Sequence, residues 1–220
     1  MKQWSTVSPL SICWHVTDAN GMIRVGKGLY HAMDRQGQSF SRWLQSVDHA
    51  ACQRILTQRM KHRLFWRIVR FMARFGPHLF FVEMAVILIT YALSATASLE
   101  IAVRGIGIAI VAAVCTKVVI DQIGKRIERK RPFVQYAFSP LLPKSADDPS
   151  FPSNHAGGAF ALGVALSLSF PAFAVVSYTL AGLLAIARVL AGLHYISDVL
   201  AGAVIGSAFA LLLVRLTPHL

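Results

Sequence analysis

Long apolar runs constrain this chain more than any other feature of its sequence. Five of them follow one another, at approximately residues 78–95, 101–123, 156–171, 172–191 and 199–216. A helix needs about 20 predominantly apolar residues to cross the hydrocarbon core of a bilayer. Hydrophobic residues make up 55% of the chain, which few soluble domains reach. We therefore predict an all-α, polytopic membrane helix bundle with about five transmembrane helices.

The connections between these runs predict how the helices are arranged. Pro171 separates the third run from the fourth, so we expect a tight turn there between antiparallel helices. The last three runs are rich in glycine and alanine, which let membrane helices approach closely. With five antiparallel helices, the loops over residues 124–154 and 192–198 emerge on the same face.

The segment before the apolar runs carries a basic amphipathic pattern over residues 54–75. Its four arginines are spaced so that they form one stripe on a helix, opposite an aromatic-rich face: Arg63, Arg67, Arg70 and Arg74. This pattern is typical of a helix in the membrane interface, and Gly76-Pro77 is expected to end it. The alternatives are packing against the protein's own bundle and a sixth transmembrane helix. Residues 1–53 carry no motif, and we divide the chain into a basic extension over 1–77 and a membrane-embedded domain over 78–220.

The charge of the chain indicates its partners. A formal net charge of +12 is compatible with nucleic-acid binding. In a chain this apolar, we expect anionic lipid headgroups and a phosphorylated membrane lipid instead, and no nucleic acid. The three cysteines are far apart and indicate free thiols. Nothing in the sequence indicates an oligomeric state.

Residues suited to binding a phosphate lie in or beside the two loops. Arg131 and Arg188 supply planar, permanently charged donors that match phosphate oxygens. Ser153 adds a hydroxyl group, and the backbone amides from Asn154 onward begin a helix whose positive end attracts anions. Ionisable groups at membrane level are costly and point to function.

Two histidines on the same face can move a proton or attack phosphorus. His194 and Asp198 are four residues apart, and a carboxylate that accepts from one ring nitrogen leaves the other as a nucleophile or base. His155 is a second histidine, suited to general acid catalysis. The alternatives are a helix-capping His155, a purely structural pair of His194 and Asp198, and a zinc site, which the nearby arginines disfavour.

The combination of Arg-Pro, Pro-Ser-Asn-His and Arg-x5-His-x3-Asp resembles the three-part signature of the type-2 phosphatidic acid phosphatase superfamily, which also includes vanadium haloperoxidases and glucose-6-phosphatase. Residues 131–160 are more narrowly similar to the bacitracin-resistance type of undecaprenyl-diphosphatase. The resemblance covers about residues 78–216. It implies an integral-membrane lipid phosphatase that converts undecaprenyl diphosphate to undecaprenyl phosphate. The alternatives are a phosphatase for phosphatidic acid, phosphatidylglycerophosphate or lipid A, a lipid phosphotransferase, and a non-enzymatic lipid-phosphate-binding protein.

The resemblance also implies residue roles, without a metal or a cofactor. His194 would form a phosphohistidine, Asp198 would orient it, and His155 would protonate the leaving oxygen. Phosphate would be bound by backbone amides and by side chains of the three motifs: Arg131, Arg188, Ser153 and Asn154.

Two departures from the family pattern concern the phosphate-binding residues. The family's lysine stands seven residues before the arginine, and that position here is Gly124. Lys125 is adjacent, but on a straight helix it lies about 120° from the face of Arg131, so its role requires the helix to unwind. Asn154 stands where glycine or aspartate is commoner. We assign Arg129 and its basic neighbours to lipid headgroups, and Lys117 and Asp121 to an ion pair within one helix.

The side of the membrane that carries the site is predicted in two ways. Residues 1–78 contain 12 lysines and arginines against three aspartates, so the positive-inside rule favours a cytoplasmic site. The resemblance implies a site on the periplasmic side of the bacterial inner membrane. We expect the periplasmic side, with the cytoplasmic side as the alternative.

Overall fold

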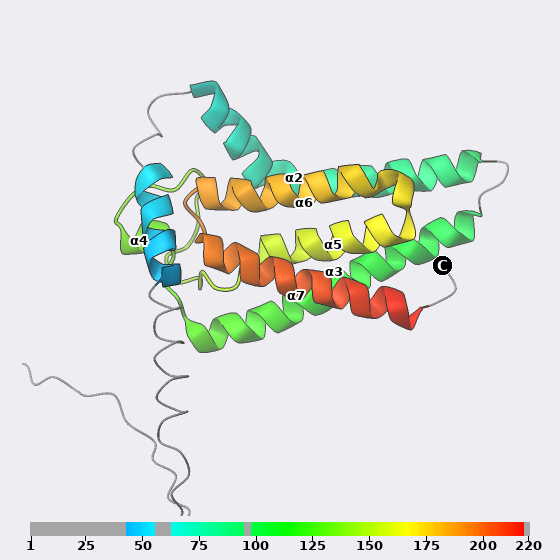
Figure 1. The fold of residues 1–220 in the computed structure, drawn as a ribbon. Helices are drawn as coiled ribbons and strands as arrows, with labels where there is room; N and C mark the ends of the chain where they lie inside the picture. Colours follow the sequence, from blue (N-terminus) through cyan, green and yellow to red (C-terminus); the bar gives the residue numbers. More distant parts are fainter. Residues whose placement is uncertain (1–42, 56–62, 95–97, 218–220) are drawn as a thin grey trace, which may run out of the picture. The chain divides into compact units, whose positions relative to one another are not determined.

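The computed structural model describes residues 43–55, 63–94 and 98–217 of the chain. The chain divides into two compact units, Met1–Trp43 and Leu44–Leu220, and nearly all described residues belong to the second. Regular structure in these residues is entirely helical (Figure 1). Besides a helix over residues 43–55, the elements are α2 (Arg63–Leu93), α3 (Leu99–Ile127), α4 (Pro132–Gln135), α5 (Asn154–Ser169), a single 3₁₀ turn (Pro171–Phe173), α6 (Ala174–Leu190) and α7 (Ile196–Leu216).

The five apolar runs form the second half of α2 and the helices α3, α5, α6 and α7, which confirms the all-α bundle. Four helical stretches are long and apolar enough to cross a membrane, at Arg63–Leu93, Leu99–Gln135, Pro171–Leu190 and Ile196–Leu216. The 16 residues of α5 extend for about 24 Å at 1.5 Å per residue, less than the hydrocarbon thickness of about 30 Å. The chain is therefore an integral membrane protein whose shortest apolar helix packs among longer ones.

The prediction that Gly76-Pro77 ends a separate amphipathic helix was wrong. Helix α2 runs without interruption from Arg63 to Leu93 and contains Pro77 in its interior. Proline lacks the amide that would bond the carbonyl four residues earlier. That carbonyl, Ala73 O, accepts instead from Nη1 of Arg188 at 3.0 Å. The predicted domain boundary at residue 77 therefore falls inside a helix.

The first half of α2 packs against the protein itself along one edge. Trp66, Val69 and Ala73 are buried in a cluster with residues of the two site loops, including Leu141 and Leu193. The predicted basic stripe of Arg63, Arg67, Arg70 and Arg74 is exposed. Along this edge the helix packs on the bundle, which was the alternative to a purely interfacial helix. Residues 56–62 of the predicted amphipathic helix lie outside the described residues.

Helix α5 is the centre of the bundle and makes its most extensive contacts with α7, α3 and α6. Glycines bring the α5 and α7 backbones together, because a Cβ atom on Gly206 would overlap the carbonyl of Gly157. The 3₁₀ turn at Pro171 joins α5 to α6, as predicted. At the other end of α5, Ser153 N donates to Asp198 O at 3.0 Å and Leu141 N to Ala191 O at 3.1 Å. These bonds confirm that the two loops share one face.

Candidate active site

A polar cavity of about 260 Å³ lies where the two loops meet. Six of the eight predicted site residues line it: Lys125, Arg131, Asn154, His155, Arg188 and His194. The other two, Ser153 and Asp198, are fully buried. The three sequence motifs therefore converge in space, and the cavity concentrates cations around two histidines.

The ring of His194 is held in one orientation by the loop before α5. Its Nδ1 lies 2.8 Å from the carbonyl oxygen of Ser150, so Nδ1 carries the proton and donates it. Nε2 is then the unprotonated nitrogen, and it faces Nη1 of Arg131 at 3.2 Å. Burial lowers the pKa of His194 to about 4 against the opposing effect of Asp198, and Arg131 and Arg188 also lower it. The imidazole is thus neutral at pH 7, with a lone pair on Nε2.

Asp198 does not bond the ring of His194 directly, contrary to the predicted arrangement. Its Oδ2 lies 3.8 Å from Nδ1, beyond hydrogen-bond distance. Ser150 joins the two residues, because its hydroxyl donates to Asp198 Oδ2 at 2.5 Å and its carbonyl accepts from His194. The carboxylate therefore acts on the ring through its charge and through Ser150, which sequence reasoning did not single out.

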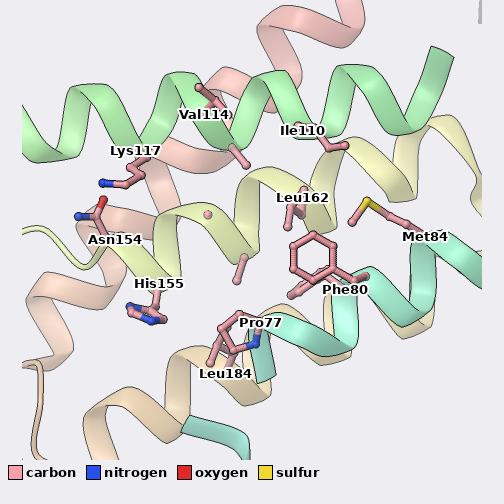
Figure 2. A pocket seen from close by; sticks show the side chains of 14 residues that line it. Pro77, Phe80, Met84, Ile110, Val114, Lys117, Asn154, His155, Leu162 and Leu184 are labelled. Atoms are coloured by element: carbon pink, nitrogen blue, oxygen red, sulfur yellow. The ribbon is translucent and has the colours of Figure 1, made fainter. Parts of the chain in front are cut away.

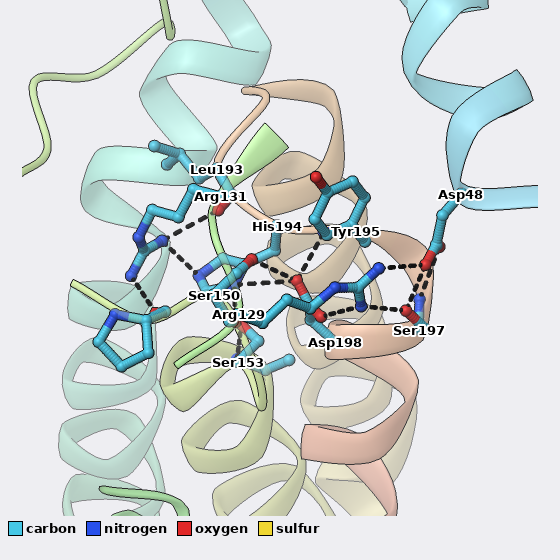
Figure 3. A network of polar contacts seen from close by, with 12 residues as sticks. Asp48, Arg129, Arg131, Ser150, Ser153, Leu193, His194, Tyr195, Ser197 and Asp198 are labelled. Atoms are coloured by element: carbon cyan, nitrogen blue, oxygen red, sulfur yellow. Dashed lines mark hydrogen bonds and ion pairs between the residues drawn. The ribbon is translucent and has the colours of Figure 1, made fainter. Parts of the chain in front are cut away.

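Arg129 faces inward, so its assignment to lipid headgroups was wrong. Nη1 donates to Asp198 Oδ1 at 2.6 Å and to Ser197 Oγ at 2.7 Å, and Nη2 donates to Asp48 Oδ2 at 2.8 Å. Its guanidinium carbon lies 3.9 Å from the ring centroid of Tyr195. Figure 3 shows Arg129 between the two carboxylates, one on α7 and one on the helix over residues 43–55.

Arg131 holds the loops together around the cavity. It precedes Pro132 at the start of α4, and its Nε and Nη2 donate to the carbonyls of Asp148 and Pro149, both at 3.0 Å. Its Nη1 donates to Leu193 O at 2.9 Å, beside the contact with His194. Arg131 thereby fixes the position of a permanent positive charge next to Nε2 of His194.

Arg188 enters the cavity from the last turn of α6 and is 4% exposed. One of its donors bonds Ala73 O in α2, the carbonyl that Pro77 leaves without a helical partner. Its Nε is buried and has no hydrogen-bond partner among the residues that the structure describes. A buried guanidinium donor that lacks a partner is suited to an anion in the cavity.

The turn before α5 is held by its own side chains. Ser153 caps the helix, and its Oγ accepts from Ala156 N at 3.4 Å. Asn154 Nδ2 donates to Asp121 Oδ1 at 2.5 Å, and Asp121 forms the predicted ion pair with Lys117, also at 2.5 Å. Asn154 therefore connects the turn before α5 to α3.

Lys144 is a cation of the cavity that sequence reasoning missed. It lines the cavity from the loop before α5 and forms an ion pair with Asp148. The hydrogen bond from Lys144 lowers the pKa of the Asp148 carboxyl group. Four cationic side chains thus surround the space in front of the histidines, listed here together: Lys125, Arg131, Lys144 and Arg188.

A second, apolar pocket of about 390 Å³ begins at His155 and runs into the bundle. Figure 2 shows it between Phe80 and Met84 of α2, Ile110 of α3 and Leu162 of α5. His155 lines both this pocket and the polar cavity. A ligand with a charged head and a long apolar tail fits the two spaces together.

Metal ligands are not gathered at this site or elsewhere in the described parts of the chain. No group of three or more histidine, cysteine, aspartate or glutamate side chains in these parts is arranged to hold an ion. The side chains around the polar cavity are mostly cationic, which suits anions.

Comparison with known proteins places this geometry in a family. The chain matches the PAP2 superfamily over residues 102–220. It is similar to the transmembrane PAP2-type phosphatidylglycerolphosphate phosphatase of Bacillus subtilis, with 20% identity and a TM-score of 0.59 over 79% of this chain and 86% of that one. The chain is also similar to LpxE of Aquifex aeolicus, with 20% identity and a TM-score of 0.58 over 73% of this chain and 91% of LpxE.

A bacterial vanadium-dependent iodoperoxidase has a similar fold, with 18% identity and a TM-score of 0.59 over 80% of this chain. The match spans 49% of the peroxidase, about half of its length. No curated protein matches the chain in a sequence comparison. At these identities, the likeness to solved structures concerns the fold.

Proposed function

This chain belongs to the PAP2 superfamily, and we propose that it is an integral-membrane lipid phosphatase that hydrolyses undecaprenyl diphosphate to undecaprenyl phosphate and phosphate. The observation that carries the proposal is the position of His155, where the cationic cavity meets the apolar pocket. A lipid phosphate that lies across both spaces presents its scissile bond to the two histidines.

The first step transfers the terminal phosphoryl group to His194. Nε2 attacks phosphorus while the bond from phosphorus to the leaving oxygen breaks, and His155 donates a proton to that oxygen. Arg131 and Arg188 stabilise the charge on the transferred group. Because Nδ1 keeps its proton on the Ser150 carbonyl, the phosphohistidine is cationic, and the nearby charge of Asp198 stabilises it.

The second step releases phosphate and restores the enzyme. A water molecule attacks the phosphorus of the phosphohistidine, and His155, now unprotonated, accepts a proton from it. The bond between phosphorus and Nε2 breaks, and its electron pair returns to His194. The cycle leaves His194 neutral and the proton on His155. Burial, and next the charge of Arg188, lower the pKa of His155 to about 3, so the negative charge of the bound substrate has to hold that proton on His155 for the next turnover.

The number of cations favours a diphosphate over a monophosphate. Arg131 contacts the ring of His194, whereas Lys125 and Lys144 line the same cavity from α3 and from the loop before α5. Lys125 reaches the cavity without the predicted unwinding, because α3 ends at Ile127 and the chain leaves the helix before Arg131. Two phosphate groups carry more charge than the arginines alone can neutralise, and Lys125 supplies one further positive charge. Lys144 supplies another by exchanging its partner Asp148 for the phosphate. This assigns Lys125 and Lys144 to the phosphate that stays on the lipid.

Phosphate release by the purified full chain in detergent tests the proposal. We expect the highest kcat/KM for undecaprenyl diphosphate in a panel with phosphatidic acid, phosphatidylglycerophosphate and lipid A phosphate. We expect no activity from His194→Ala, full activity in EDTA and unchanged activity from Asp147→Asn, which alters an exposed loop acid. An active His194→Ala protein, or loss of activity in EDTA, contradicts this mechanism, and substoichiometric free phosphate indicates transfer to another lipid.

We further propose that the site faces the periplasm of a bacterial inner membrane, as the family resemblance implies. A cysteine at Ser145, an exposed residue of the site loop, tests this in a variant that lacks the three native cysteines. Labelling by a membrane-impermeant thiol reagent in spheroplasts supports the periplasmic side. Labelling only after the membrane is opened places the site in the cytoplasm, as the positive-inside rule predicts.

A further inference from the structure

Asp48 is a buried acid in a part of the chain without any sequence motif. It lies on the helix over residues 43–55 and is 4% exposed. Oδ1 accepts from Ser197 N at 3.1 Å, and Oδ2 accepts from Ser197 Oγ at 2.5 Å and from Arg129 Nη2 at 2.8 Å. A buried carboxylate is expensive unless it is paired and hydrogen-bonded. These three bonds show that the position is built for a charge.

The partners of Asp48 lead to the reactive ring through a short series of bonds. Arg129 joins Asp48 to Asp198, and Asp198 accepts the hydroxyl of Ser150. The backbone of Ser150 is held on both sides, because its amide donates to Arg129 O at 2.7 Å and its carbonyl accepts from His194 Nδ1. Arg129 therefore determines the position of both groups that orient His194.

The helix that carries Asp48 also packs behind the site. Ala51 and Cys52, on the same helix, line one small space together with His194 and Tyr195. Cys52 is buried and so is the ring of His194. Residues 43–55 are thus in direct proximity to the reactive histidine, although they precede the nearest motif by more than 70 positions.

We propose that Asp48 is a positioning residue of the active site, which acts through Arg129 on Asp198 and Ser150 and thereby on His194. The helix over residues 43–55 then belongs to the catalytic domain and is no accessory extension. Without the charge of Asp48, Nη2 of Arg129 has lost its partner, and the guanidinium is held only by Ser197 and Asp198 of α7 and by the ring of Tyr195. The inference rests on the proposed phosphatase activity, since it uses that activity as its readout.

Two variants of the full chain test the proposal in detergent. Asp48→Asn keeps an oxygen for Ser197 N and removes the charge that holds Arg129. We expect kcat to fall about tenfold, less than the roughly 100-fold that a misplacement of about 1 Å can cause, because Asp198 and Ser197 still hold Arg129. KM and inhibition by inorganic phosphate stay unchanged, because Arg131 and Arg188 remain in place. Gln53→Ala, an exposed position of the same helix, is the matched control and keeps wild-type kcat.

A double-mutant cycle with Arg129→Gln tests whether Asp48 acts on His194 through Arg129. If Asp48 acts through Arg129, Asp48→Asn changes kcat by less than about twofold in the Arg129→Gln background, although it has its full effect in the wild type. Equal effects in both backgrounds overturn the route. A kcat for Asp48→Asn equal to the wild type, or a loss confined to KM and thermal stability, overturns the positioning role.

Failure of the proposed function gives a different result. If the wild-type protein releases no phosphate from any lipid in the panel, the phosphatase assignment is wrong. If the wild type is active and Asp48→Asn matches it, only the inference about Asp48 is wrong. Asp48→Asn is chosen over Asp48→Ala because asparagine keeps an oxygen that accepts from Ser197 N at the start of α7, so the variant is expected to fold.

Discussion

The two spaces that meet at His155 are built in opposite ways. The polar cavity is surrounded by loops and helix ends, and its side chains are held by hydrogen bonds to residues far away in the sequence, such as Arg131 to Leu193 and Arg188 to Ala73. The apolar pocket is surrounded by the regular faces of α2, α3, α5 and α6. The first depends on the position of each donor, whereas the second depends on volume and hydrophobicity alone. The polar cavity should therefore tolerate far fewer substitutions than the pocket.

Among substitutions that leave both histidines in place, the largest loss is expected from Arg188→Lys, which keeps the charge and changes its geometry. Lysine has no planar set of donors that can bond Ala73 O and an anion together. We expect kcat/KM for undecaprenyl diphosphate to fall about 100-fold, as for the loss of one donor to a developing charge. Arg215→Lys, at the opposite end of α7 from the site, is the control and keeps its activity. Near-normal activity of Arg188→Lys shows that charge alone suffices.

The acidity of His194 gives a prediction from the polar cavity alone. An ordinary histidine has a pKa near about 6.5, but burial lowers the pKa of His194 to about 4. The reactive form of His194 is neutral. As far as His194 is concerned, kcat/KM therefore stays constant down to about pH 5 and falls near pH 4, where the ring becomes protonated. Arg131→Gln removes a cation that lowers the pKa of His194, so this pKa rises. The acid limb of the plot of kcat/KM against pH should then move to higher pH.

Comparing Arg131→Gln with the wild type on one substrate removes the contribution of the substrate's own titration. An acid limb that does not move in Arg131→Gln contradicts the assignment of that limb to His194.

The apolar pocket is tested by filling it. Gly158 lines the pocket, and a Cβ atom built on it meets nothing within 4 Å. Gly158→Leu should therefore fold normally, since glycine is itself unfavourable inside a helix. We expect KM for undecaprenyl diphosphate to rise about tenfold, as several apolar contacts of the tail are lost, while a short-chain prenyl diphosphate is unaffected. Equal effects on both substrates show that the tail lies elsewhere.

The sequence predicted the apolar half of the molecule well because its determinants are local. Helix periods, small residues and Pro171 indicated α3, α5, α6 and α7 within a few residues of their ends. The prediction that a helix ends at Gly76-Pro77 was wrong for a physical reason. A local break was predicted from the missing amide, but a side chain from α6 bonds the free carbonyl and the helix continues. No pattern within α2 contains that information.

Motif spacing placed the predicted site residues together, because each motif lies at a helix end on the same face. Ser150, Arg129 and Asp48 were missed because their roles come from contacts between distant residues. Asp48 and Ser197, for example, are 149 positions apart. In the basic run before Pro132, nothing distinguishes the half-buried Arg129 from the exposed Arg126.

Pro77 lines the apolar pocket, affects the polar cavity only through Arg188, and gives the smallest expected effect. Its missing amide leaves Ala73 O to Arg188. In Pro77→Ala, the new amide competes with Arg188 for that carbonyl, and we expect kcat/KM to fall about threefold, as for one weakened hydrogen bond of under about 1 kcal/mol. The loss should be the same for long-chain and short-chain diphosphates and absent in the Arg188→Lys background. A loss confined to the long-chain substrate shows instead that Pro77 acts by lining the apolar pocket. In that case Pro77 affects the binding of the lipid tail and does not act through Arg188.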